Sequence, residues 1–193
     1  ASSHAQILFF TSLGKVYKIK GYRIPEASRT ARGTNIVNVL PLDPGEKVSA
    51  MVHADDILAE GMYINLITKQ GTIKRMELSI LKNIRSTGIR ALNLVDEDEL
   101  IAALLTNGSD NIVIATAGGM AICFAETDVR PMGRDAAGVR GILLSDDDFV
   151  VGAERYDEEK TLLTVTENGF GKRTELPEYL RTGPDGEKIP QGR

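Results

Sequence analysis

Short apolar runs alternate with polar turns along the chain, and one pattern recurs four times. It consists of an apolar strand, a polar turn that ends in glycine, and a second strand. Glycine at the end of such a turn supplies the positive φ that a tight hairpin needs. The pattern predicts four β-hairpins: ILFFTSLGKVYKI from Ile7, INLITKQGTIKRM from Ile64, IVIATAGGMAICF from Ile112 and LLTVTENGFGKRT from Leu162.

A second signature follows each of the first three hairpins. It reads ARGTNIVNVL at 31–40, STGIRALNL at 86–94 and AAGVRGILL at 136–144. In each copy a glycine precedes a strand with β-branched residues, and an acidic turn and another apolar strand follow. Each unit therefore has four short strands, two in a hairpin and two flanking the acidic turn.

Four strands per repeat of about 50 residues are typical of a propeller-like array of blades. We predict an all-β fold with about four four-stranded blades, in repeats of approximately 1–54, 55–105, 106–155 and an incomplete 156–193. A single blade is too small to bury both of its faces, so stacking between blades must supply the core.

Composition adds few constraints to this prediction. The chain has 193 residues, 42% hydrophobic content and a net charge of −4, which are ordinary values for a globular domain. Cys123 is the only cysteine, so an internal disulfide framework is excluded and a reducing compartment is indicated. The N-terminal ASSHAQILFF has neither a basic region nor an initiator Met, and we interpret it as a cut inside a longer protein.

Charge is segregated within the repeats. Acids gather in the turns at 43–46, 96–99, 146–148 and 157–159, whereas basic residues follow the second hairpin strand and the loop after it. Stacked repeats with this bias predict a basic stripe on one edge, which would attract phosphate, and an acidic rim opposite. The basic residues are Lys15, Lys18, Lys20, Arg23, Arg29 and Arg32; Lys74, Arg75, Lys82, Arg85 and Arg90; Arg130, Arg134 and Arg140; and Lys172, Arg173 and Arg181.

The third repeat departs from this pattern. Where the first repeat has Lys15, Lys18 and Lys20, the third has Met120, Cys123 and Ala125. We expect this hairpin strand to contribute little to the stripe and to be covered by a neighbour, with Cys123 as a buried small hydrophobic residue.

The residues predict no catalytic site. The sequence contains no P-loop, no G-x-S-x-G, no H-E-x-x-H and no Cys/His ligand cluster. We interpret His4 as a structural hydrogen-bonding residue, His53 as a surface or edge residue, and Asp146–Asp148 as a solvated turn without EF-hand spacing.

Three strings carry a resemblance to a known family. FFTSLGKVYKIKGYRIPEASRTARGTNIVNVLPL, STGIRALNLVDEDEL and TENGFGKRTELPEYL resemble the C-terminal domain of the bacterial DNA gyrase A subunit, and the resemblance runs through essentially the whole chain. It implies a β-pinwheel whose blades exchange hairpin strands. It also implies that the basic perimeter binds, bends and wraps double-stranded DNA for ATP-dependent negative supercoiling.

The resemblance also implies roles, partners and location. The contacting residues would be the basic ones given above together with Arg193, although Arg130 is not included among them. The partners would be the rest of the gyrase A subunit together with the gyrase B subunit in a heterotetramer, in the bacterial cytoplasm with the nucleoid and without a membrane. No cofactor is implied here, because ATP and Mg²⁺ serve other parts of the holoenzyme.

Two departures from the family pattern matter. No complete Q-R-R-G-G-K-G-type box occurs, although the terminal PQGR resembles the start of one. Family discs commonly have five or six blades, so we expect this chain to be a fragment, with unpaired edges that invite association. The corresponding domain of topoisomerase IV and a propeller used for protein interaction are the alternative interpretations.

Overall fold

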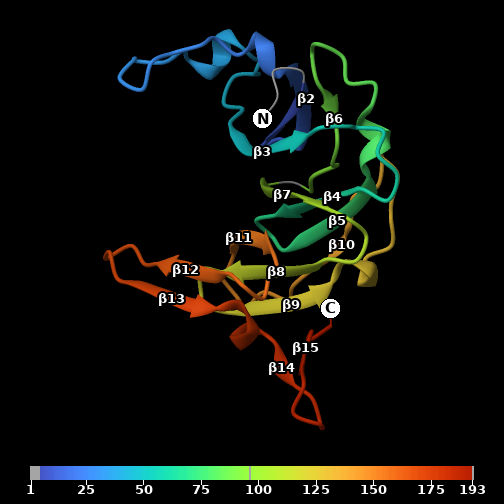
Figure 1. Ribbon diagram of the computed structural model, residues 1–193, viewed down its shortest axis with the longest axis vertical. Coiled ribbons are helices and arrows are strands. Elements are labelled where there is room, and N and C mark those ends of the chain that lie inside the picture. The colour runs from blue at the N-terminus through green and yellow to red at the C-terminus, as the bar shows by residue number, and fades with distance from the viewer. Residues whose placement is uncertain (1–4, 96, 193) are drawn as a thin grey trace.

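The structure, a computed structural model, describes residues 5–95 and 97–192. In these ranges the secondary structure consists of strands and short 3₁₀ turns, without α-helix. The all-β prediction is confirmed. Figure 1 shows β2 and β3 at the top, β4 and β5 below them, β8 and β9 beside β12 and β13 further down, and β14 and β15 at the bottom.

The first two blades have four strands each. The first has the order β3(Val48–Ala54), β1(Gln6–Thr11), β2(Lys15–Lys20) and β6(Ile89–Arg90). The second has the order β10(Val139–Arg140), β5(Thr72–Glu77), β4(Tyr63–Thr68) and β7(Leu100–Thr106). All of these strand pairs are antiparallel. A hairpin turn joins the two central strands of each blade, β1 to β2 and β4 to β5.

The third and fourth blades have fewer strands. The third comprises β11(Val150–Arg155), β8(Asn111–Thr116) and β9(Ala121–Ala125), and the fourth is the hairpin β12(Thr161–Val165) and β13(Gly171–Glu175). A small hairpin, β14(Arg181–Thr182) and β15(Lys188–Ile189), follows. The expectation of a four-stranded blade was therefore wrong for the third repeat, whereas the fourth had been predicted to be incomplete.

The fourth strand of a blade comes from the next repeat. β6 lies in the second repeat but pairs with β2, and β10 lies in the third repeat but pairs with β5. The repeat pattern placed these strands inside their own repeats and gave them more residues, whereas the family resemblance implied the exchange between blades that the structure shows. The segment after Gly33 was also expected to be a strand, but it forms the 3₁₀ turn η2(Ile36–Asn38), since no neighbouring strand among the described residues pairs with it.

The two largest apolar clusters lie between blades, whereas a smaller one around Phe9 and Tyr17 lies within the first repeat. One cluster joins Leu8 and Phe10 of the first blade to Ile64 and Leu66 of the second. A second cluster joins the second and third blades, and the strands β3, β7 and β11 pack beside one another in succession. In Figure 1 these three strands lie toward the left, and the exchanged strands β6 and β10 lie toward the right.

Candidate nucleic-acid interface

Three connecting segments follow the second hairpin strand of the first three repeats. We call residues 21–38 the first strap, 78–90 the second strap and 126–140 the third strap. Each contains a 3₁₀ turn at its start: η1(Gly21–Arg23), η3(Leu78–Leu81) and η4(Glu126–Asp128). The second and third straps end in β6 and β10, which fixes them to the blade before.

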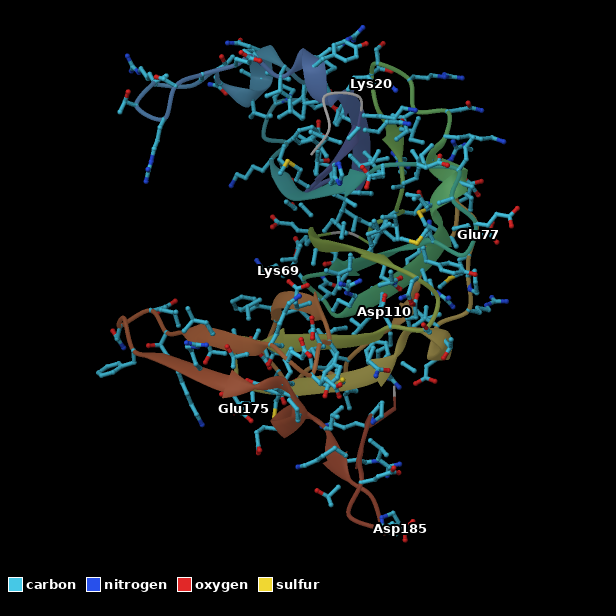
Figure 2. The ribbon with its side chains drawn as sticks, viewed as in Figure 1. Lys20, Lys69, Glu77, Asp110, Glu175 and Asp185 are labelled. Carbon is cyan, nitrogen blue, oxygen red and sulfur yellow. The ribbon has the colours of Figure 1, made fainter. Side chains whose placement is uncertain are left out.

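Each strap carries three exposed basic side chains. The first also contains the exposed acid Glu26, whereas the second contains no acid and is preceded by exposed Glu77. Figure 2 shows Glu77 on the right-hand side, opposite Lys69. The third strap has exposed Asp128 and Asp135, so its basic charge is the most nearly balanced. The nine basic residues are Arg23, Arg29 and Arg32; Lys82, Arg85 and Arg90; and Arg130, Arg134 and Arg140.

Arg130 is a candidate that the residue-by-residue prediction did not include. It lies on the third strap and is exposed. It stands eleven residues after the turn glycine Gly119, the same offset that separates Lys82 from Gly71. That offset, counted along the repeats, is the sequence signal that identifies it.

The lysines of β2 are partly engaged within the protein. Lys15 forms an ion pair with Asp43, and Lys18 Nζ donates to the carbonyl oxygen of Lys82 at 2.7 Å. Burial, followed by the neighbouring charge of Lys20, lowers the pKa of Lys18. Lys20 is exposed at the end of the strand (Figure 2), so it is the β2 lysine best placed to meet an external anion.

Lys74 was predicted to lie on the basic stripe, and the structure contradicts this. Its side chain is completely buried, and Nζ donates to the carbonyl oxygens of Ala91 at 2.8 Å and Arg134 at 2.5 Å. These two acceptors belong to the chain just after the second strap and to the third strap. Burial lowers the pKa of Lys74 to about 8. Lys74 therefore holds connecting segments together rather than facing solvent.

Arg75 is the second correction. Only 5% of it is exposed, Nε lies 2.9 Å from Glu126 Oε2, and the guanidinium stacks on the Tyr63 ring at 3.8 Å from the centroid. NH1 also donates to the carbonyl oxygen of Val129 at 3.3 Å. The third strap covers β5 at this point, which removes Arg75 from the surface and turns it into a contact between the second and third blades.

The fourth repeat presents its basic residues to solvent. Lys172, Arg173 and Arg181 are exposed. Arg173 donates to Thr161 Oγ1 from Nε at 3.2 Å and from NH2 at 3.1 Å. The predicted contact residue Arg193 lies outside the described residues.

The break in the stripe at the third repeat has a structural cause. Cys123 is completely buried and packs with Leu176, Tyr179 and Leu180 of the fourth repeat. Burial raises the pKa of its thiol to about 11. The prediction that Cys123 is a buried hydrophobic residue covered by a neighbour is confirmed.

The first three acidic turns each commit one carboxylate to the preceding hairpin turn, which limits the predicted acidic rim. The hydroxyl of Thr116, more than the backbone donors, lowers the pKa of Asp148. The contacts run from Thr11 Oγ1 to Glu46 Oε1 at 2.6 Å, from Gln70 N to Asp98 Oδ1 at 2.9 Å, and from Gly118 N to Asp148 Oδ1 at 2.7 Å.

The described residues offer no cluster of three or more His, Cys, Asp or Glu side chains suited to a metal ion. His53 is exposed, with Nε2 3.4 Å from Asp55 Oδ1, while His4 lies outside the described residues. Among the helices that the structure describes, none is long and apolar enough to cross a membrane. The arrangement thus offers repeated exposed cations on successive connecting segments.

Comparison with known proteins agrees with this architecture. The family model described as DNA gyrase C-terminal domain, beta-propeller, matches residues 5–54, 63–107, 110–157 and 160–189. The DNA gyrase A subunit of Staphylococcus epidermidis is 45% identical over 190 residues, which is 97% of this chain and 21% of the relative. That of Clostridium acetobutylicum is 51% identical over 178 residues, covering 92% and 21% of the two chains. The chain therefore spans about a fifth of the length of these relatives.

Solved structures show the same fold. The C-terminal domain of DNA topoisomerase IV superposes with a TM-score of 0.82 at 24% identity, covering 99% of this chain and 58% of that one. A DNA gyrase A C-terminal domain superposes with a TM-score of 0.75 at 27% identity, covering 91% and 56% of the two chains.

Proposed function

Because the chain belongs to the DNA gyrase C-terminal domain family, we propose that it is a non-catalytic module that binds and bends double-stranded DNA within DNA gyrase. It would present the wrapped DNA to the cleavage core for ATP-dependent negative supercoiling. Its partners would be the rest of the gyrase A subunit together with the gyrase B subunit in a heterotetramer, in the bacterial cytoplasm. ATP and Mg²⁺ would serve those other parts, and this segment would need no cofactor.

The observation that carries the proposal is the repetition of exposed cations on three successive straps. A duplex following the straps would meet Arg or Lys side chains at each of them. Contacts of this kind go to phosphates and release counterions, and they carry no base-reading information. Smooth bending of 20–30 bp by 40–90° costs on the order of 1–6 kcal/mol, which several such contacts can offset.

The second strap is the best place to test the proposal. Lys82, Arg85 and Arg90 are exposed, and the backbone of this strap is held by pairing with β2. Their joint replacement by Ala should leave the fold intact. DNA affinity should fall, and the slope of log K against log salt should shrink by about 0.9 for each phosphate that is no longer neutralised.

Lys47→Ala is the matched control, because Lys47 is exposed and lies in an acidic turn rather than on a strap. Fluorescence anisotropy with a labelled duplex of about 40 bp gives affinity and salt slope, and energy transfer between its ends reports bending. An unchanged slope in the triple variant, or an equal loss in the control, would refute the assignment of the straps as the DNA-binding surface.

Two other functions are less well supported. The topoisomerase IV structure shares the fold, but its 24% identity carries no further argument, whereas the curated gyrase A relatives reach 51%. A protein-interaction module would use the acidic turns, yet one carboxylate of each of the first three is already engaged in holding a hairpin turn.

A further inference from the structure

Two connecting segments meet at the end of the Lys74 side chain. Lys74 lies on β5, and its Nζ donates to the carbonyl oxygen of Ala91 at 2.8 Å and to that of Arg134 at 2.5 Å. Ala91 directly follows Arg90, the last residue of the second strap, whereas Arg134 belongs to the third strap. One ammonium group therefore holds the backbone beside an exposed cation of each strap.

A second side chain makes another contact at the same junction. Asn93 Nδ2 donates to the carbonyl oxygen of Asp135 at 2.7 Å, one residue beyond the Arg134 carbonyl that Lys74 binds. Asn93 is partly exposed, whereas Lys74 is completely buried. The junction therefore has an inner contact made by Lys74 and an outer contact made by Asn93, and both join segments that are distant in the chain.

Packing alone does not require an ammonium group at this position. Burial lowers the pKa of Lys74, and the nearby charge of Asp135 only partly offsets this effect. The same position, three residues after the turn glycine, holds Tyr17 in the first repeat and Ile122 in the third. A buried charge destabilises a fold unless its polar bonds compensate. The two carbonyl bonds are therefore what the lysine adds at this position.

Both straps keep their other attachments when Lys74 is replaced. The second strap ends in β6, which pairs with β2, and the third ends in β10, which pairs with β5. Met132 N also donates to the Arg75 carbonyl oxygen at 2.8 Å, which holds the middle of the third strap on β5. Loss of the Lys74 bonds should therefore leave each strap on its blade and loosen the position of one strap relative to the other.

We propose that Lys74, assisted by Asn93, is a positioning residue for DNA bending, because it sets the spacing between the exposed cations of the second strap and those of the third. This inference rests on the proposed function, in which a duplex follows successive straps. Counterion release depends on how many cations meet phosphates. The bend depends in addition on whether these cations keep their places while the duplex resists deformation. Lys74 should consequently affect the bend more than the salt dependence of binding.

The spacing of the straps can be measured without DNA. Nitroxide labels attached to Ser86→Cys and Ala137→Cys, at exposed positions of the second and third straps, report the distance between the straps by electron paramagnetic resonance. Lys74→Met should broaden the distribution of this distance, and Asn93→Ala should broaden it less, because the buried contact remains. Cys123 is buried and should stay unlabelled. An unchanged distribution in Lys74→Met would overturn the inference.

Bending is measured by energy transfer between the ends of the duplex of about 40 bp at saturating protein. The change in transfer on binding should fall by about half for Lys74→Met, while the salt slope stays unchanged because the exposed cations remain. Asn93→Ala should cause a smaller fall. Ile7→Ala is the matched control, since Ile7 is buried in the apolar cluster of the first repeat rather than at the junction.

The outcomes distinguish this inference from the proposed function. If the unmodified chain does not bend the duplex, the proposed function fails, and the role of Lys74 in bending fails with it. If the unmodified chain bends the duplex and Lys74→Met bends it equally, only the inference is overturned. An equal fall in Ile7→Ala would also overturn it, because lower stability would then explain the loss. Should Lys74→Met not fold, unchanged strap spacing and bending in Asn93→Ala would count against the inference in the same way.

Discussion

Replacing Glu126 by Leu is expected to be among the most destabilising single changes in this chain. Glu126 is completely buried and stands seven residues after its turn glycine, where Leu78 and Leu176 stand in the second and fourth repeats. It pairs with Arg75, and its oxygens accept from Thr106 Oγ1 at 2.7 Å, Gly108 N at 2.8 Å and Asp110 N at 3.0 Å.

Removing Glu126 should destabilise the folded state more than removing Arg75. Without Glu126, the Arg75 guanidinium keeps only the Val129 carbonyl oxygen and the Tyr63 ring, and three donors lose their acceptor. Without Arg75, the carboxylate keeps all three donors. Breaking a buried pair costs about 3–5 kcal/mol of the free energy of unfolding. We therefore expect the loss to be near the upper limit for Glu126→Leu and near the lower limit for Arg75→Met.

The double variant tests the reasoning. With both charges removed, the free energy of unfolding should recover by about 2 kcal/mol or more relative to the sum of the two single changes, because no uncompensated charge remains. Guanidinium denaturation followed by circular dichroism measures each member of the cycle. Additive losses, or Arg75→Met costing more than Glu126→Leu, would refute the buried-pair interpretation.

The same variants separate a structural role from a DNA-binding one. Arg75→Met/Glu126→Leu should keep the salt slope of DNA binding, because Arg75 does not reach the surface. If the double variant reduced the slope by about 0.9, as expected when one phosphate is no longer neutralised, the assignment of Arg75 to the interior would be wrong.

Three further predictions concern the turns and the free thiol. Glu97 and Asp147 have φ of 64° and 62° at the position that Gly45 occupies in the first repeat, so replacing either by Gly should raise the free energy of unfolding by up to about 1 kcal/mol in thermal denaturation; a loss would contradict this. Asp148→Asn should lower the melting temperature at neutral pH. Because the folded pKa of Asp148 is depressed, that difference should disappear as pH falls through the folded value, whereas a difference that persists at about pH 2 would rule out the charge as its cause. Cys123, buried and with its thiol pKa raised to about 11, should react with a thiol reagent only as fast as the protein opens, and rapid reaction in the folded state would contradict its burial.

The hairpins and their turn glycines were predictable because they depend on short-range patterns. Gly14 and Gly71 have the positive φ that was expected of them. Counting from these glycines also relates Lys82 to Arg130 and Leu78 to Glu126, which is enough to define the straps. The exposed strap residues Arg29, Arg85 and Arg134 were likewise predictable, because loops that connect strands lie on the surface.

The burial of Lys74 and Arg75 was not predictable in the same way. They stand on a hairpin strand, as Lys15 and Lys18 do. Lys74 takes the place of the buried Tyr17 three residues after the turn glycine, but Arg75 takes the place of the partly exposed Lys18, and nothing local distinguishes those two cations. The burial of Lys74 and Arg75 depends on the third strap, which lies about fifty residues further along the chain and crosses β5 to supply Glu126 and the Arg134 carbonyl oxygen.

The repeat, the hairpins and the side of each repeat that carries positive charge follow from local periodicity and composition, so the residues alone predict them. The blade that receives each exchanged strand and the cations that remain in water are set by the three-dimensional packing. Those outcomes depend on contacts between residues far apart in the chain, where a neighbouring blade converts an exposed strand position into an interior one.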